Sequence, residues 1–123
     1  MNRNLSITAL LGIIAIIFGA FGAHALKEVL TIDALQSFET AVRYQMYHVI
    51  VLLFVNTYAG FSTKIKNSIS LVFFIAILFF SGSIYAITMG RIDPKFIWFI
   101  TPLGGFLFIA GWFIMLLNFL KKN

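Results

Sequence analysis

The sequence predicts an all-α integral membrane protein, a four-helix bundle with a short amphipathic interfacial helix between the first and second spans. Hydrophobic residues make up 61% of the 123 residues and charged residues only 11%, which is too little polar surface to cover a soluble domain of this size. The apolar residues form four runs, each close to the ~20 residues that a helix needs to cross a bilayer. We therefore expect a single transmembrane domain over residues 1–123, with no room for a soluble catalytic domain.

The first predicted span covers residues 5–25, with Arg3 before it and Lys27 after it. A signal peptide also begins with a basic residue and an apolar stretch, but its apolar core is usually shorter, roughly 7–15 residues. We expect a retained helix, because the rest of the chain is itself membrane-like.

The second predicted span covers residues 42–60 and follows a segment of different character. In residues 31–42 apolar side chains recur at helical spacing among polar ones. This pattern predicts a short amphipathic helix at the membrane surface that runs into the span. Asp33, with Gln36 three residues later, is expected to cap the N-terminus of this helix.

The third predicted span covers residues 68–89 and follows a loop that carries Lys64 and Lys66. The fourth covers residues 96–120 and contains Thr101-Pro102. Either the helix begins at this proline, where a missing N–H is tolerated, or it bends there.

Basic residues predict the orientation of these spans. Four spans would put both termini and the second loop on one side, with five basic residues, Arg3, Lys64, Lys66, Lys121 and Lys122. The other side has three, Lys27, Arg91 and Lys95, or four with Arg43. The positive-inside rule then places both termini in the cytoplasm. Because the basic residues stand at the ends of apolar runs, we read the net charge of +5 as membrane anchoring and expect no nucleic-acid partner.

Small residues should mark the contacts between helices, because lipid does not drive apolar helices together. The candidate helix-packing glycines are Gly12, Gly19, Gly22, Gly82, Gly104 and Gly111.

The second span carries the most polar face. Gln45, His48, Leu52 and Asn56 follow one another at steps of three or four residues and share one face, close to Tyr44. Polar groups are costly in hydrocarbon, so this face should look into the bundle. Together with His24, the only other histidine, these residues form a candidate functional polar cluster: His24, Tyr44, Gln45, His48 and Asn56.

Two kinds of chemistry are open to this cluster. His24 and His48 could ligate a haem iron, although His24 lies near a helix end while His48 is deeper. His48 could also relay protons, but the four acidic residues all lie in loops or at helix ends, and proton paths usually need buried carboxylates. We expect no enzymatic activity, metal site or resident cofactor. The absence of cysteine excludes disulfides and thiolate ligands.

Four motifs resemble a known family. They are residues 19–26 (GAFGAHAL), 44–48 (YQMYH), 79–85 (FFSGSIY) and 101–105 (TPLGG). In order and spacing they are similar to the uncharacterised membrane family called domain of unknown function 423, or transmembrane protein 256-like. The characteristic residues of the family fall here on Gly19, Gly22, His24, Tyr44, Gln45, His48, Ser81, Gly82, Tyr85, Thr101, Pro102 and Gly104. The resemblance implies a small four-span protein of the bacterial inner membrane and assigns no role to the histidines.

Three functions follow as hypotheses. The leading one is a non-enzymatic structural or accessory subunit that packs against a larger membrane complex or forms a homo-oligomer within the lipid bilayer. The alternatives are a small-solute or proton transporter or channel that uses the His48/Asn56 face, and a haem-binding membrane protein that uses His24 and His48.

Overall fold

The computed structural model describes residues 2–90 and 92–121, and every regular element in this part of the chain is a helix. Four of these helices are long, namely α1 (Arg3–Ala23), α2 (Ile32–Thr57), α3 (Thr63–Thr88) and α5 (Ile100–Lys121). The 3-10 helix η1 (Leu26–Glu28) joins α1 to α2, and the short helix α4 (Pro94–Ile97) lies between α3 and α5. Arg91 and Lys122, which enter the orientation count, lie outside the described residues.

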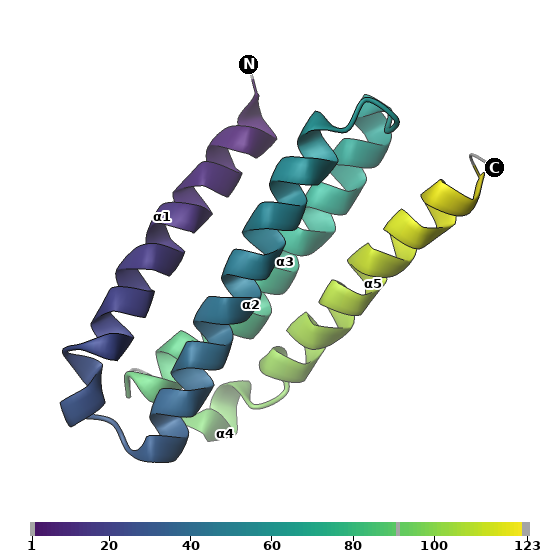
Figure 1. Cartoon of the computed structure of the whole chain (residues 1–123). Helices are drawn as coiled ribbons and strands as arrows, with labels where there is room; N and C mark the ends of the chain where they lie inside the picture. Colours follow the sequence, from purple (N-terminus) through teal and green to yellow (C-terminus); the bar gives the residue numbers. More distant parts are fainter. Residues whose placement is uncertain (1, 91, 122–123) are drawn as a thin grey trace.

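Consecutive long helices run in opposite directions, and α2 and α3 lie between α1 and α5 (Figure 1). The main packing joins α1 to α2, α2 to α3 and α3 to α5. The arrangement is therefore more open than the predicted four-helix bundle, since the outer helices α1 and α5 pack mainly on their inner neighbours. The chain start and the α2–α3 loop lie at one end, whereas η1 and α4 lie at the other (Figure 1).

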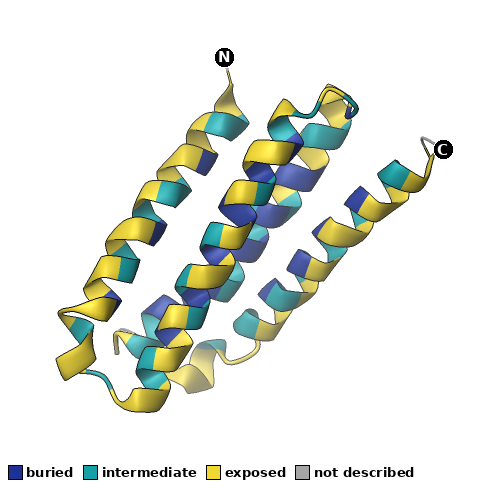
Figure 2. Ribbon diagram, viewed as in Figure 1, coloured by how far each residue is buried: buried dark blue, intermediate teal, exposed yellow. Residues whose placement is uncertain are grey.

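Burial is uneven across the molecule. Buried residues follow the mutually facing sides of α2 and α3, while α1 and α5 leave wide faces exposed (Figure 2). The larger core cluster joins α2, α3 and α5 through Leu52, Phe73 and Phe108. A smaller cluster at the other end contains Phe38, Ala41 and Tyr85, with Phe18 of α1 packed against it. Because the exposed faces are apolar, they fit a lipid solvent.

Three of the long helices are long and apolar enough to cross a membrane by length and composition, namely α1, α3 and the stretch Pro94–Lys121 that includes α5. The helix α2 has 26 residues, as α3 does, but it does not reach the same hydropathy. Its first half contains Asp33, Glu39 and Arg43, and its second half contains His48 and Asn56. The helix α2 is therefore long enough to cross a membrane, but it is more polar than the other three long helices.

The short amphipathic helix predicted over residues 31–42 runs into the second span, as expected, and its place at the membrane surface stays a prediction. Residues 32–57 form one continuous helix, so this segment is the first part of α2. The cap differs from the prediction, because the Thr31 side chain, not Asp33, accepts a hydrogen bond from the Ala34 N–H at 3.1 Å. Thr31 has the extended backbone that a cap residue needs, and Asp33 lies within the first turn.

A separate short helix, which the sequence did not predict, precedes α5. Asp93 caps α4 by accepting a hydrogen bond from the Lys95 N–H at 3.0 Å, and Pro94 takes the first helical position. Two turn residues, Trp98 and Phe99, separate α4 from α5. The helix α5 begins at Ile100, so Pro102 lies in its first turn, where its missing N–H removes no helical bond. Of the two alternatives for Thr101-Pro102, the structure therefore agrees better with a helix that begins near the proline than with a helix that bends there.

The glycines differ in what they permit. An added Cβ would lie 3.4 Å from Val49 at Gly12, 3.5 Å from Val42 at Gly19 and 3.2 Å from Phe38 at Gly22, so these three glycines of α1 face α2. At Gly104 the added atom would lie only 2.8 Å from the Cα of Phe80, and at Gly111 it would collide with the Phe73 ring. Among the described residues Gly82 faces no other helix at this range, because the nearest atom to an added Cβ belongs to Leu78 of its own helix, at 3.7 Å.

Candidate functional site

Polar side chains inside the molecule are few and come from three helices. The buried ones among the described residues are Thr8, Gln45, His48, Ser70, Ser81 and Ser83. In hydrocarbon a buried polar group needs a partner within the protein. The partners of these groups show what the polar face of α2 does.

Gln45 ties three helices together. Its side chain is 1% exposed, and its Nε2 donates to the main-chain oxygen of Leu11 in α1 at 2.7 Å. Its Oε1 accepts from the hydroxyl of Tyr85 in α3, also at 2.7 Å. Nearby, the Ser81 hydroxyl donates to the main-chain oxygen of Ala41 at 2.7 Å. These bonds cross between helices, so they hold α1, α2 and α3 in a defined register.

His48 faces α5 and is 4% exposed. Its Nδ1 lies 2.7 Å from the main-chain oxygen of Tyr44, and a carbonyl oxygen only accepts, so Nδ1 carries the proton. Its Nε2 lies 3.0 Å from Nε1 of Trp112, and an indole N–H only donates, so Nε2 is the acceptor. The imidazole ring stacks on Phe108, with a centroid separation of 3.9 Å and an interplanar angle of 21°. The geometry thus describes a neutral imidazole with both nitrogens engaged.

Asn56 belongs to a separate asparagine network near the chain start. Its Nδ2 donates to the Ser70 hydroxyl at 2.8 Å and to the Leu52 main-chain oxygen at 2.9 Å. Its Oδ1 accepts from Nδ2 of Asn4 at 3.0 Å, and the same Asn4 group donates to Oδ1 of Asn67 at 2.8 Å. This network joins the beginning of α1, the end of α2 and the beginning of α3.

The structure does not gather the predicted polar cluster into one site. Gln45, His48 and Asn56 lie on the inner side of α2, but each is bonded to a different set of partners. Tyr44 is partly exposed, and its ring packs beside Phe80 at 5.3 Å between centroids. His24 is exposed and forms the C-cap of α1.

The two histidines are in different surroundings. His24 borders a shallow apolar hollow on α1 formed with Ile17, Phe21 and Ala25, whereas His48 is enclosed by Phe73, Phe108 and Trp112. This geometry gives no support to a haem held between them. Among residues 2–90 and 92–121, no group of three potential metal-ligating side chains comes together.

Two residues that complete these interactions were not assigned to the cluster from sequence. Tyr85 is part of the family pattern, but nothing in its position along the chain pairs it with Gln45, which lies forty residues earlier. Trp112 follows Phe108 by one helical turn and is partly exposed. Its position in an apolar run is that of an aromatic residue facing lipid. A buried histidine and a buried glutamine each need a hydrogen-bond partner on a facing helix. This requirement could have pointed to Tyr85 and Trp112 as candidates.

Comparison with known proteins gives a consistent picture. A family model described as "Protein of unknown function (DUF423)" matches residues 18–105. The chain is 39% identical over 113 residues to "UPF0382 membrane protein SSP2132" of Staphylococcus saprophyticus. This alignment covers 92% of this chain and 92% of the relative. It is 39% identical to a UPF0382 membrane protein of Haemophilus influenzae, over 90% of this chain and 88% of the relative.

A more distant relative is "UPF0382 inner membrane protein YgdD" of Escherichia coli K12, which is 31% identical over 92% of this chain and 86% of its own length. No solved structure matches the chain. The matched segment runs from α1 to the second turn of α5 and includes Gln45, His48, Asn56 and Tyr85.

Proposed function

Because the chain belongs to the DUF423 family of membrane proteins, we propose that it is a four-span inner-membrane protein that acts as a non-enzymatic structural or accessory subunit. The observation that carries this proposal is that the buried polar groups are bonded within the protein. Within residues 2–90 and 92–121, each buried polar side-chain atom has a hydrogen-bond partner in the chain itself. The polar face of α2 is thereby used to hold helices together, which leaves the outer faces for a partner.

Four spans are supported by the position of α2. This helix packs against α1 on one side and α3 on the other, and both neighbours have the length and hydropathy of membrane spans. A helix between two spans of similar length crosses the same layer. The polarity of α2 is tolerated there because Gln45 and His48 are buried and bonded.

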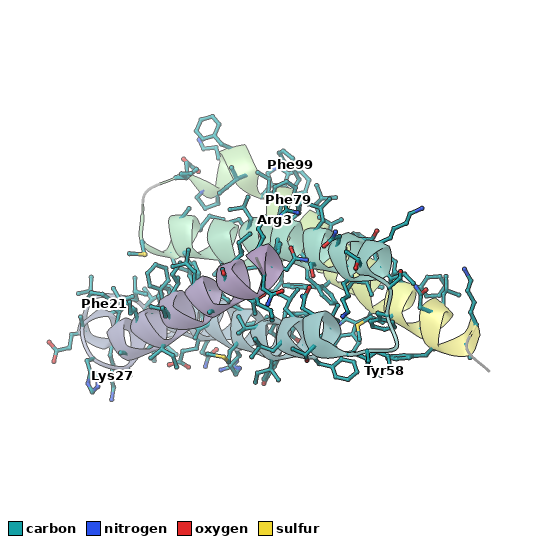
Figure 3. The ribbon with its side chains drawn as sticks, turned by 90° about the horizontal axis from the view of Figure 1, so that it is seen from above. Arg3, Phe21, Lys27, Tyr58, Phe79 and Phe99 are labelled. Carbon is teal, nitrogen blue, oxygen red and sulfur yellow. The ribbon has the colours of Figure 1, made fainter. Side chains whose placement is uncertain are left out.

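The charge distribution supports cytoplasmic termini. Arg3, Lys64, Lys66 and Lys121 lie at the end of the molecule that contains the chain start and the α2–α3 loop. Arg3 and Lys27 lie at opposite ends of the α1–η1 segment (Figure 3). All four acidic residues, Glu28, Asp33, Glu39 and Asp93, belong to the end with η1 and α4. The positive-inside rule counts Lys and Arg, so the end that carries more of these residues is the one that it keeps in the cytoplasm.

Photocrosslinking from the outer faces tests the accessory role. Ile16 of α1, Leu78 of α3 and Ile109 of α5 are matched positions, because each side chain is 66% exposed. A photoreactive residue at each position should yield a protein adduct from one or two faces only, either with another protein or with a second copy. If all three positions yield lipid adducts alone, and gentle solubilisation releases only a monomer, the proposal fails.

A small-solute or proton transporter is the second candidate, and polar clefts at both ends of the molecule favour it. One cleft contains Asn4 and Asn56, and the other contains Asp33, Thr40 and Thr101. Buried apolar side chains, including Leu52 and Phe73, lie between these ends, so transport would need a second conformation. Flux in reconstituted vesicles that is unchanged by His48→Ala would remove this candidate.

A further inference from the structure

A polar cleft of about 460 Å³ opens at the end of the molecule that carries the chain start. It lies between the beginning of α1, the end of α2 and the beginning of α3, and its walls include Asn2, Arg3, Asn4, Asn56, Lys66 and Asn67. In a four-span protein this is the level at which α1 and α3 enter the membrane surface. The cleft is therefore at the depth of lipid headgroups.

The cleft is positively charged. Arg3 and Lys66 line it, and none of the described lining residues is acidic. Within the part of the chain that the structure describes, neither cation forms an ion pair, because all four carboxylates belong to the opposite end. Two unpaired cations in one cleft favour an anionic ligand.

The asparagine network shapes the wall of the cleft. Both hydrogens of the Asn4 Nδ2 group are used, one to Asn56 and one to Asn67. Asn67 accepts with its Oδ1, so its Nδ2 group keeps donors for a ligand. An amide donor beside an arginine and a lysine suits the several acceptor oxygens of a phosphate group.

From this combination we propose that the cleft binds a phosphate anion, and that its source at this depth is the headgroup of an anionic phospholipid. Arg3 would supply a forked set of N–H donors, Lys66 a point charge and Asn67 an amide N–H. This inference goes beyond the accessory role, and it holds whether or not a partner subunit exists.

Native mass spectrometry of delipidated protein tests the proposal, with phosphatidylglycerol and phosphatidylcholine as the added lipids. The wild-type protein should retain phosphatidylglycerol in preference to phosphatidylcholine. The double variant R3Q/K66Q should weaken retention of phosphatidylglycerol about tenfold or more, since each basic residue near an anionic surface contributes to binding. The control is Lys64→Gln, because Lys64 is an exposed residue of the first turn of α3 and does not line the cleft.

Each outcome is decisive. Retention lost in R3Q/K66Q and kept in Lys64→Gln supports a site in the cleft, whereas equal losses would show diffuse attraction to a basic surface and overturn it. Inorganic phosphate at millimolar concentration distinguishes the source. If it does not displace the lipid, the headgroup is the ligand; if it displaces the lipid from the wild-type protein, the cleft is a phosphate site that free anions also fill. Equal retention of both lipids by the wild-type protein would refute the proposal.

Discussion

The indole N–H of Trp112 in α5 donates a hydrogen bond over 3.0 Å to Nε2 of His48 in α2. This bond joins two helices that are not consecutive in the chain. It also determines the tautomer of the imidazole, since Nδ1 must then donate to the main-chain oxygen of Tyr44. His48 is thereby described as a neutral residue that links helices, and this role can be measured.

Trp112→Phe should leave the buried Nε2 of His48 without its donor. We expect the free energy of unfolding to fall by about 1 kcal/mol, the size of an interhelical hydrogen bond in a membrane protein. Nitrogen-15 NMR of the imidazole groups should show the Nδ1–H tautomer for His48 in the wild-type protein, with the exposed His24 as an internal reference. Trp98→Phe is the matched control, because Trp98 is 67% exposed and lies outside the core. An Nε2–H tautomer for His48 would refute this interpretation.

Gln45 and Tyr85 should be energetically coupled. Gln45→Leu leaves the Tyr85 hydroxyl without its acceptor, and Tyr85→Phe removes the donor to Gln45. Each single change is expected to destabilise the protein, and the double variant should lose less than the sum of the two. The difference, measured by unfolding in detergent as a double-mutant cycle, should be about 0.5–1.5 kcal/mol. Strict additivity would show that this bond does not contribute to stability.

Adjacent glycines in α5 offer a sharp test of helix packing. At Gly104 an added Cβ would lie 2.8 Å from the Cα of Phe80, so α3 and α5 would have to move apart. At Gly105 no neighbouring atom of the part of the chain that the structure describes lies within 4 Å of the added atom. Gly104→Ala should therefore destabilise the protein by roughly 1–3 kcal/mol, whereas Gly105→Ala should be neutral or stabilise the helix by up to about 1 kcal/mol. Equal effects in a detergent unfolding titration would contradict the close approach of these helices.

The long helices can be placed approximately from the sequence wherever an apolar run is uninterrupted. The third run was predicted at 68–89 and α3 covers Thr63–Thr88, because an uninterrupted apolar stretch has few alternatives in a chain of this composition. The residues at which the helices begin and end were harder to predict. Thr31 and Asp33 are both good cap residues, and only the backbone of Thr31 shows which one precedes the first turn. The turn at Trp98 and Phe99 was also missed, since both residues are apolar and continue the pattern of the run.

The candidate site was predicted less completely than the fold. Helical spacing placed Gln45, His48 and Asn56 on one face of α2, and these residues do lie on its inner side. It could not give their partners, because Leu11, Tyr85 and Trp112 belong to other helices and meet α2 only after packing. His24 was grouped with them by residue type alone, and the structure places it at the exposed end of α1. The same holds for the glycines predicted to pack between helices, since Gly82 is a glycine within a span but, among the residues that the structure describes, no other helix lies within 4 Å of an added Cβ.

The four-span topology is tested most directly by cysteine labelling, which the chain suits because it contains no native cysteine. Single variants Lys64→Cys, Lys121→Cys and Glu28→Cys would be treated in intact cells with a membrane-impermeant maleimide. We expect Lys64→Cys and Lys121→Cys to react only after the membrane is opened, and Glu28→Cys to react at once. If Lys64→Cys and Lys121→Cys are labelled from opposite sides of the membrane, the number of spans between them is odd and the proposed topology is wrong.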